Sequence, residues 1–189
     1  MADPHDVNNY SIGKGILYIA EWSGDTPPTD PTDYDEMGNC PSVEVEPTIE
    51  RLPHYSSRAS FRLKDKNPVT QSEYVCSFSC DEICSANLNK FLLGTLSGAT
   101  ISGLQGTDKE YALKFLSDNP IGTNQRWKMW KCTVSPNGAM ALIGDEWMVM
   151  DFSAEGLADT ANHADSPYFD VDFITTTTTT STTTTTTTA

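Results

Sequence analysis

The stretch from Ser72 to Gly94 constrains the fold most, because a strand pattern passes directly into a helix pattern. Between Glu73 and Cys80 apolar and polar residues alternate, and this period of two is typical of a half-buried strand. Residues 81–93 then carry apolar side chains at the spacing of one helix face, and Gly94 suits the position after a helix end. The two patterns predict one strand followed by one helix that covers part of a larger structure.

The rest of the chain has the pattern of β-strands. Alternation or short apolar runs predict strands at residues 13–22, 43–52, 99–104, 110–116, 126–134, 139–143, 146–154 and 169–173. The first of these is apolar on both faces, so we expect it to be covered on both sides, by the core and by a helix or a neighbouring subunit. Trp127, Trp130 and Trp147 are expected between sheet and helix. The predicted fold class is mainly β (α+β): a β-sandwich or barrel flanked by one α-helix, with extended N- and C-terminal arms.

The 189 residues are expected to form one domain at residues 13–174, with a helix near 81–93 and a long loop at 53–68. Residues 1–12 are polar and non-periodic, which predicts an N-terminal arm. Residues 175–189 are almost all threonine and form a low-complexity C-terminal tail.

The charge of the chain and the distribution of its apolar residues exclude several classes of function. The formal net charge is −14 and the pI is about 4.3, so general electrostatic binding to a nucleic-acid backbone is not expected. The beginning of the chain lacks a basic segment followed by an apolar one, which predicts no secretory signal. No apolar run approaches the ~20 residues of a membrane span. We therefore expect a soluble protein that is intracellular when made and has no membrane partner.

The sequence predicts no cofactor, metal or catalytic site. The five cysteines are an odd number, which argues against a disulfide framework. Cys76, Cys80 and Cys84 are spaced four apart, unlike common zinc pairs, and are expected to be reduced, buried and metal-free. No nucleophile–base pair, paired carboxylates or phosphate-binding loop stands out, so the chain is not expected to be an enzyme.

One face of the strand predicted at 43–52 is acidic. Glu44, Glu46 and Glu50 share it, and Glu73 is expected to extend it from a neighbouring strand. This face either looks into bulk water or forms a charged channel wall.

The segment at 53–68 is the most basic part of the chain. With Arg51, it places five of the twelve basic residues within sixteen positions, and Leu52, Tyr55 and Phe61 are candidate apolar anchors. A connection this long is often functional, and a basic loop in an acidic chain favours contact with an acidic surface of its own chain or of a copy. The alternative is a solvated loop of mixed charge. The basic residues predicted to make the contact are Arg58, Arg62, Lys64 and Lys66.

Several stretches, taken in order, resemble the tail tube (major tail) proteins of long-tailed, non-contractile bacteriophages, the siphoviruses. They are IGKGILYIAEW, VEVEPTIERLPHYSSRASFRL, SEYVCSFSCDEICSANLNKFLLGT and DEWMVMDFSAEGLADTANHADSPYFDVDF. Together with the polar arm before them, they spread over most of residues 8–174. The threonine tail lies outside the resemblance.

The resemblance implies a structural protein that forms hexameric rings stacked into a helical tube, through which DNA is ejected without specific binding. The basic loop would make inter-ring contacts, and Glu44, Glu46, Glu50 and Glu73 would line the channel. The implied partners are further copies of the chain and the terminator, distal tail and tape measure proteins. The implied location is the virion tail, with the host cytoplasm during assembly.

Two alternatives remain at this point. One is a monomeric acidic β-sandwich that serves as a binding or adhesin module, with the threonine tail as a stalk. The other is a tube protein of a secretion system or contractile tail, with the same fold and different partners.

Overall fold

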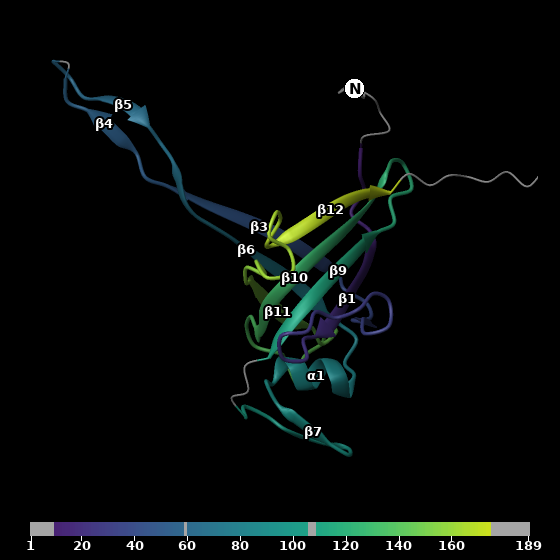
Figure 1. The fold of residues 1–189 in the computed structure, drawn as a ribbon. Coiled ribbons are helices and arrows are strands. Elements are labelled where there is room, and N and C mark those ends of the chain that lie inside the picture. Colours follow the sequence, from purple (N-terminus) through teal and green to yellow (C-terminus); the bar gives the residue numbers. More distant parts are fainter. Residues whose placement is uncertain (1–9, 59, 106–108, 175–189) are drawn as a thin grey trace, which may run out of the picture.

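A computed structural model describes residues 10–58, 60–105 and 109–174. These residues form a mainly β protein with one helix, as the sequence predicts (Figure 1). The strands are β1 (Gly15–Glu21), β2 (Asp35–Glu36), β3 (Ser42–Arg51), β4 (His54–Ser56), β5 (Leu63–Lys66), β6 (Val69–Cys80), β7 (Thr95–Ser97), β8 (Thr100–Ser102), β9 (Glu110–Ser117), β10 (Asn124–Pro136), β11 (Met150–Gly156) and β12 (Phe169–Ile174), and the helix is α1 (Ser85–Phe91). Most of the predicted N-terminal arm (residues 1–9) and the whole threonine tail lie outside the described residues.

The main sheet bends into two antiparallel layers that share the long strand β10. The strand order is β2-β1-β9-β10-β11-β6-β3, and β12 also pairs with β10. Residues 124–129 of β10 pair with β12 and residues 132–136 pair with β11, so the strand changes its neighbour along its length. One layer is therefore β2-β1-β9-β10-β12, and the other is β10-β11-β6-β3.

The core lies between these layers. Phe152 of β11 is fully buried, stacks on Phe78 with ring centroids 4.9 Å apart, and meets Phe91 of α1 edge-on at 5.6 Å. The helix thus closes one end of the sandwich, beside the β7–β8 hairpin (Figure 1). Burying large aromatic side chains contributes roughly 1.5–3 kcal/mol each, so this cluster is a main source of stability.

Strand β1 is covered on both sides, and the second cover is the chain's own loop at residues 22–34. Leu17 and Ile19 face the core, whereas Ala20 on the opposite face is also buried. The indole of Trp22 donates a hydrogen bond to the Trp130 carbonyl (2.9 Å), which fixes the start of this loop across β10. The proline-rich acidic loop therefore takes the place of the helix or neighbouring subunit expected from the sequence.

The helix is shorter than the predicted 81–93. It begins after Cys84, whose sulfur accepts a hydrogen bond from the Asn87 backbone N–H (3.4 Å). The buried Asn87 amide donates to the carbonyls of Met37 (2.9 Å) and Glu82 (3.2 Å), which holds residues 81–84 outside the helix. Cys76 and Cys80 are buried as expected, but Cys84 is exposed, because it caps the helix and does not join its apolar stripe.

Three further expectations differ from the structure. The segment 139–143 is not a strand, and β11 takes the place beside the end of β10. Trp147 is not packed between sheet and helix but is 92% exposed, since the last strand of this region begins only at Met150. The segment 53–68 is not a simple loop: it contains β4 and β5, which pair with each other.

Candidate assembly surfaces

A long hairpin projects from the sandwich and is the most distinctive feature of the surface. Strands β3 and β6 pair from Ser42↔Ser79 at the root to Arg51↔Val69, and β4 and β5 continue the hairpin to its tip. Figure 1 shows the tip far from both layers. Nearly every residue from 46 to 73 is exposed, and we call this segment the arm. The alternating sequence forms a strand pair here although the body does not cover it.

The arm exposes large apolar side chains. Ile49 shares a face with Val43 and Val45, and the sequence places all three toward the core. In the structure Ile49 is 56% exposed, because the hairpin has already left the sandwich at that point. Contiguous apolar exposure on a soluble protein marks an interaction surface more often than a solvated one. The exposed apolar residues of the arm are Ile49, Leu52, Tyr55, Phe61, Leu63 and Val69.

The cations of the arm have no carboxylate partners within the described part of the chain. The Arg62 guanidinium lies over the Tyr55 ring, 5.5 Å from its centroid, and Arg51 donates to the Asn67 carbonyl (3.3 Å). The one carboxylate of the tip, Asp65, contacts His54. Among the described residues, none of the four predicted contact residues forms an ion pair; these are Arg58, Arg62, Lys64 and Lys66.

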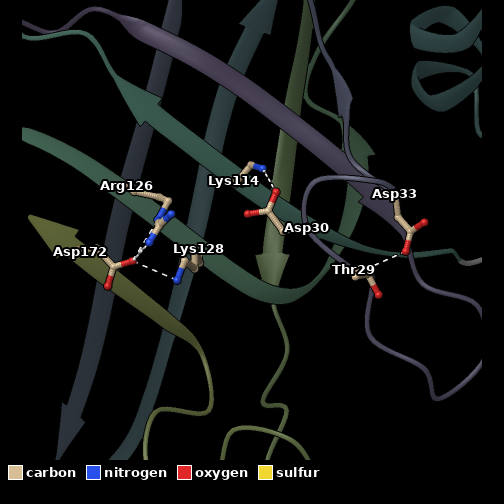
Figure 2. Close-up of polar contacts among 7 residues, drawn as sticks. All are labelled: Thr29, Asp30, Asp33, Lys114, Arg126, Lys128 and Asp172. Carbon is tan, nitrogen blue, oxygen red and sulfur yellow. Dashed lines mark hydrogen bonds and ion pairs between the residues drawn. The ribbon is translucent and has the colours of Figure 1, made fainter. Parts of the chain in front are cut away.

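Five of the seven lysines and arginines outside the arm, in contrast, form ion pairs within the described chain; Lys14 and Lys90 do not. Lys114 is buried under the proline-rich loop, where it pairs with Asp30 and lies 4.6 Å from the Tyr34 ring centroid. Asp172 of β12 accepts from Arg126 (2.7 Å) and Lys128 (2.9 Å), as Figure 2 shows. Two further ion pairs lie on the same layer: Lys131–Glu110 and Lys109–Glu21.

This division of charge distinguishes the arm from the body. The body pairs most of its basic groups with its own carboxylates, whereas no lysine or arginine of the arm has such a partner in the described chain. In a chain of net charge −14, such a surface is complementary to the acidic body of another copy. The sequence shows that basic residues are concentrated in the arm. It does not show which cations of the body are paired, because that pairing depends on long-range contacts such as Asp30–Lys114.

The acidic face also forms as the alternation predicts. Glu46 lies opposite Val75 and Glu50 opposite Gln71, so the glutamates point to the side of β3 and β6 away from the core. Val43 and Val45 on the other side face Phe115, Trp127 and Met129 of the second layer. The four exposed carboxylates brought onto one face are Glu44, Glu46, Glu50 and Glu73.

Two more acidic residues belong to this face and were missed by reasoning from the sequence. Glu155 of β11 lies opposite Val75, which separates it from Glu46 on β3, and Asp151 lies opposite Ser79, from which it accepts a hydrogen bond (2.7 Å). The alternation of Asp151, Ser153 and Glu155 in the sequence indicates their common side. Only the strand order reveals that β11 lies beside β6.

A second exposed apolar surface lies at the other end of the molecule. Residues 138–149, which we call the end loop, connect β10 and β11. Leu142 is 74% exposed and Ile143 96%, in addition to the exposed Trp147. Met150 pairs with Cys80 at the end of β6 that lies next to α1, whereas the arm extends from the opposite end of β6. The arm and the end loop therefore lie at opposite ends of the sandwich.

The described chain also contains a cavity with a volume of about 310 Å³. It lies beneath the proline-rich loop, beside Tyr34, Lys114 and Trp130. Its two lysines are already paired, Lys114 with Asp30 and Lys128 with Asp172, and Trp130 stacks on His163 at 3.7 Å. Within the described ranges, no cluster of three metal-ligating side chains occurs. None of the helices in those ranges is long and apolar enough to cross a membrane.

Comparisons with known proteins give one partial family match and several similar structures. Residues 10–100 match a family described as "Protein of unknown function UCP028589". No curated protein matches the chain.

Three solved structures have folds that align with most of the chain. The tail of an empty GTA particle with C6 symmetry aligns with a TM-score of 0.40 and 7% identity, covering 84% of this chain and 96% of that one. The anti-feeding prophage cap, which terminates a tube, aligns with a TM-score of 0.40 and 7% identity. The alignment covers 92% of this chain and 95% of that one. The sheath–tube complex of PVC, an extracellular contractile injection system, in its extended state aligns with a TM-score of 0.38 and 10% identity. The alignment covers 88% of this chain and 94% of that one.

The ion pairs of Asp172 lead to a prediction about pH. Hydrogen bonds from Lys128 and Arg126 hold the pKa of the Asp172 carboxyl below its usual value. A folded-state pKa below the unfolded value of about 3.9 means stability that is present above that pH and is lost as pH falls through the folded pKa. We expect Asp172→Asn to lower Tm at neutral pH, and the difference from wild type to shrink in acid.

This prediction is checked by measuring Tm from pH 7 to pH 2. Asp118→Asn, in the exposed turn after β9, makes the same charge change away from the pair and should follow wild type throughout. An Asp172→Asn curve that runs parallel to wild type down to the lowest pH would contradict the assignment.

Proposed function

We propose that this chain is the structural subunit of a siphovirus-type tail tube. In this proposal six copies form a ring, the rings stack into a helical tube, and DNA leaves through the lumen without specific binding. The protein would act without catalysis, in the virion tail, after assembly in the host cytoplasm. Its partners would be copies of itself and the terminator, distal tail and tape measure proteins.

The observation that carries this proposal is the presence of two exposed apolar surfaces at opposite ends of one sandwich. The arm leaves one end, and the end loop with Trp147 lies at the other. A contact between two different surfaces of identical subunits is heterologous, and it propagates into rings or open filaments. A monomeric binding module would have no need for both. The order of the strand, helix and loop motifs in the sequence supports the same class of protein.

Electron microscopy of the purified full chain tests the proposal. We expect rings or tubes of uniform diameter that increase with protein concentration, because association buries both surfaces. A monodisperse monomer at all concentrations would favour the alternative, an acidic β-sandwich module with a threonine-rich stalk. A tube that recruits a contractile sheath would favour the other alternative, a tube protein of a contractile tail.

The acidic face leads to a prediction about the channel. We expect Glu44, Glu46, Glu50 and Glu73 to line the lumen of the assembled tube, because they share the side of β3 and β6 opposite to Val43 and Val45, which pack into the sandwich. Carboxylates repel the phosphate backbone within about a Debye length, ~8 Å at physiological salt, so the DNA would pass without adhering. A reconstruction of the tube locates these side chains directly. Finding them on the exterior, or buried between subunits, would contradict the prediction.

A functional comparison tests the same idea. Glu46→Lys combined with Glu73→Lys should make assembled tubes retain duplex DNA in a salt-dependent manner, since cationic groups bind DNA by releasing counterions. Glu36→Lys with Asp118→Lys makes the same change in net charge on the other layer and should not cause the tubes to retain DNA.

A further inference from the structure

We infer that the end loop, residues 138–149, is the surface on which the tip of the arm of a second copy docks. This inference rests on the proposed function and identifies the two surfaces that meet when subunits join end to end. Neither surface is covered within the described chain. Each carries an apolar patch, and the charges beside the two patches are of opposite sign.

The apolar parts of the two surfaces match in kind. The end loop offers Trp147 together with Leu142 and Ile143, all more than 70% exposed. The tip offers Phe61, Leu63 and Tyr55, which range from 42% to 66% exposed. Aromatic residues of this kind provide most of the binding free energy where they fill a water-free contact. Contact between the two patches buries apolar side chains that the isolated subunit exposes to water.

The charged parts are complementary. Asp145 and Glu146 lie between the apolar residues of the end loop, and the loop contains no lysine or arginine. In the described structure neither carboxylate forms an ion pair. The tip carries cations that also lack carboxylate partners there, including Arg62 and Lys64. Opposite charges beside two apolar patches favour one orientation of contact over others.

The geometry requires that this contact be made between molecules. The end loop joins β11 beside Cys80 and α1, whereas the arm leaves the sandwich at the opposite end of β6. The arm points away from the body (Figure 1), so it does not reach the end loop of its own chain. A contact between the tip of one copy and the end loop of the next adds subunits along one direction, which is the growth mode of a stacked tube.

A charge exchange between the two surfaces tests the inference with full-length protein. Asp145→Lys with Glu146→Lys should raise the protein concentration needed for polymerisation by at least about tenfold, the change that 1.4 kcal/mol of lost contact produces. Arg62→Glu with Lys64→Glu should have a similar effect. Combining all four substitutions should restore polymerisation to within a few-fold of wild type. Circular dichroism and Tm establish that each variant is folded.

Two further variants separate docking from net charge and from the proposed function. Trp147→Ala should also raise the critical concentration at least tenfold, and Glu36→Lys with Asp118→Lys should not raise it. If the Asp145/Glu146 and Trp147 variants polymerise like wild type, the docking assignment is wrong while the tube function stands. If the quadruple variant fails to recover although folded, the charge pairing is wrong. If wild type never polymerises, the proposed function itself fails.

Discussion

Reversing Arg62 and Lys64 to glutamate is expected to prevent tube assembly up to concentrations at least about tenfold above the wild-type threshold and to leave the monomer folded. Both residues lie in the arm, where they have no ion pair in the described structure, and β4 and β5 at this end of the arm form a two-stranded sheet separate from the main sheet. Monomer stability should therefore change by no more than about 0.5 kcal/mol, as for most surface substitutions. The effect on assembly is much larger, because each contact recurs in every subunit of every ring.

The magnitude follows from repetition. One surface ion pair contributes only about 0–1 kcal/mol. Contacts within a ring act together, so the loss is multiplied over all subunits that join in one step. The reversal also replaces attraction by repulsion in a chain whose net charge is already −14. We therefore expect tubes to be absent at concentrations well above the wild-type threshold.

Sedimentation and electron microscopy at physiological salt check this expectation. Lys14→Glu with Lys90→Glu makes the same change in net charge outside the arm and should polymerise almost normally. Normal tube yield from the Arg62/Lys64 variant would remove the arm from the assembly contact. Loss of tubes in both variants would mean that net charge alone controls association.

Replacing Phe152 by alanine is expected to have the largest effect on folding. Its ring is fully buried between Phe78 and Phe91, so it joins strands β6 and β11 to the helix. Truncating a buried phenylalanine typically costs about 3–5 kcal/mol, from lost transfer free energy and from the cavity that remains. For a chain of this size, each kcal/mol lowers Tm by roughly 2–4 °C. We therefore expect Tm to fall by roughly 6–20 °C.

Thermal and urea unfolding of the monomer measure this loss. Phe173→Ala on β12 is the matched control, because Phe173 is 69% exposed and its truncation should change stability by no more than about 0.5 kcal/mol. Equal destabilisation by the two substitutions would show that the cluster of Phe78, Phe152 and Phe91 does not dominate the core.

Local patterns in the sequence determined most of the strands, the acidic face of β3 and the concentration of basic residues in the arm. Alternation placed Glu44, Glu46 and Glu50 on one side of β3, and the structure has them there. Side-chain direction in a strand depends only on the backbone period, so neighbouring residues suffice to predict it. The same holds for the basic concentration around Arg62, which is a property of composition.

Tertiary structure decided what each surface faces. Ile49 follows the apolar alternation but is exposed, because the hairpin extends beyond the sandwich. Trp147 has the composition of a core residue but lies in the end loop, because pairing between β10 and β11 begins only near Met150. Lys114 is buried because the proline-rich loop brings Asp30 over it. These outcomes depend on contacts between segments far apart in the chain, which no local period encodes.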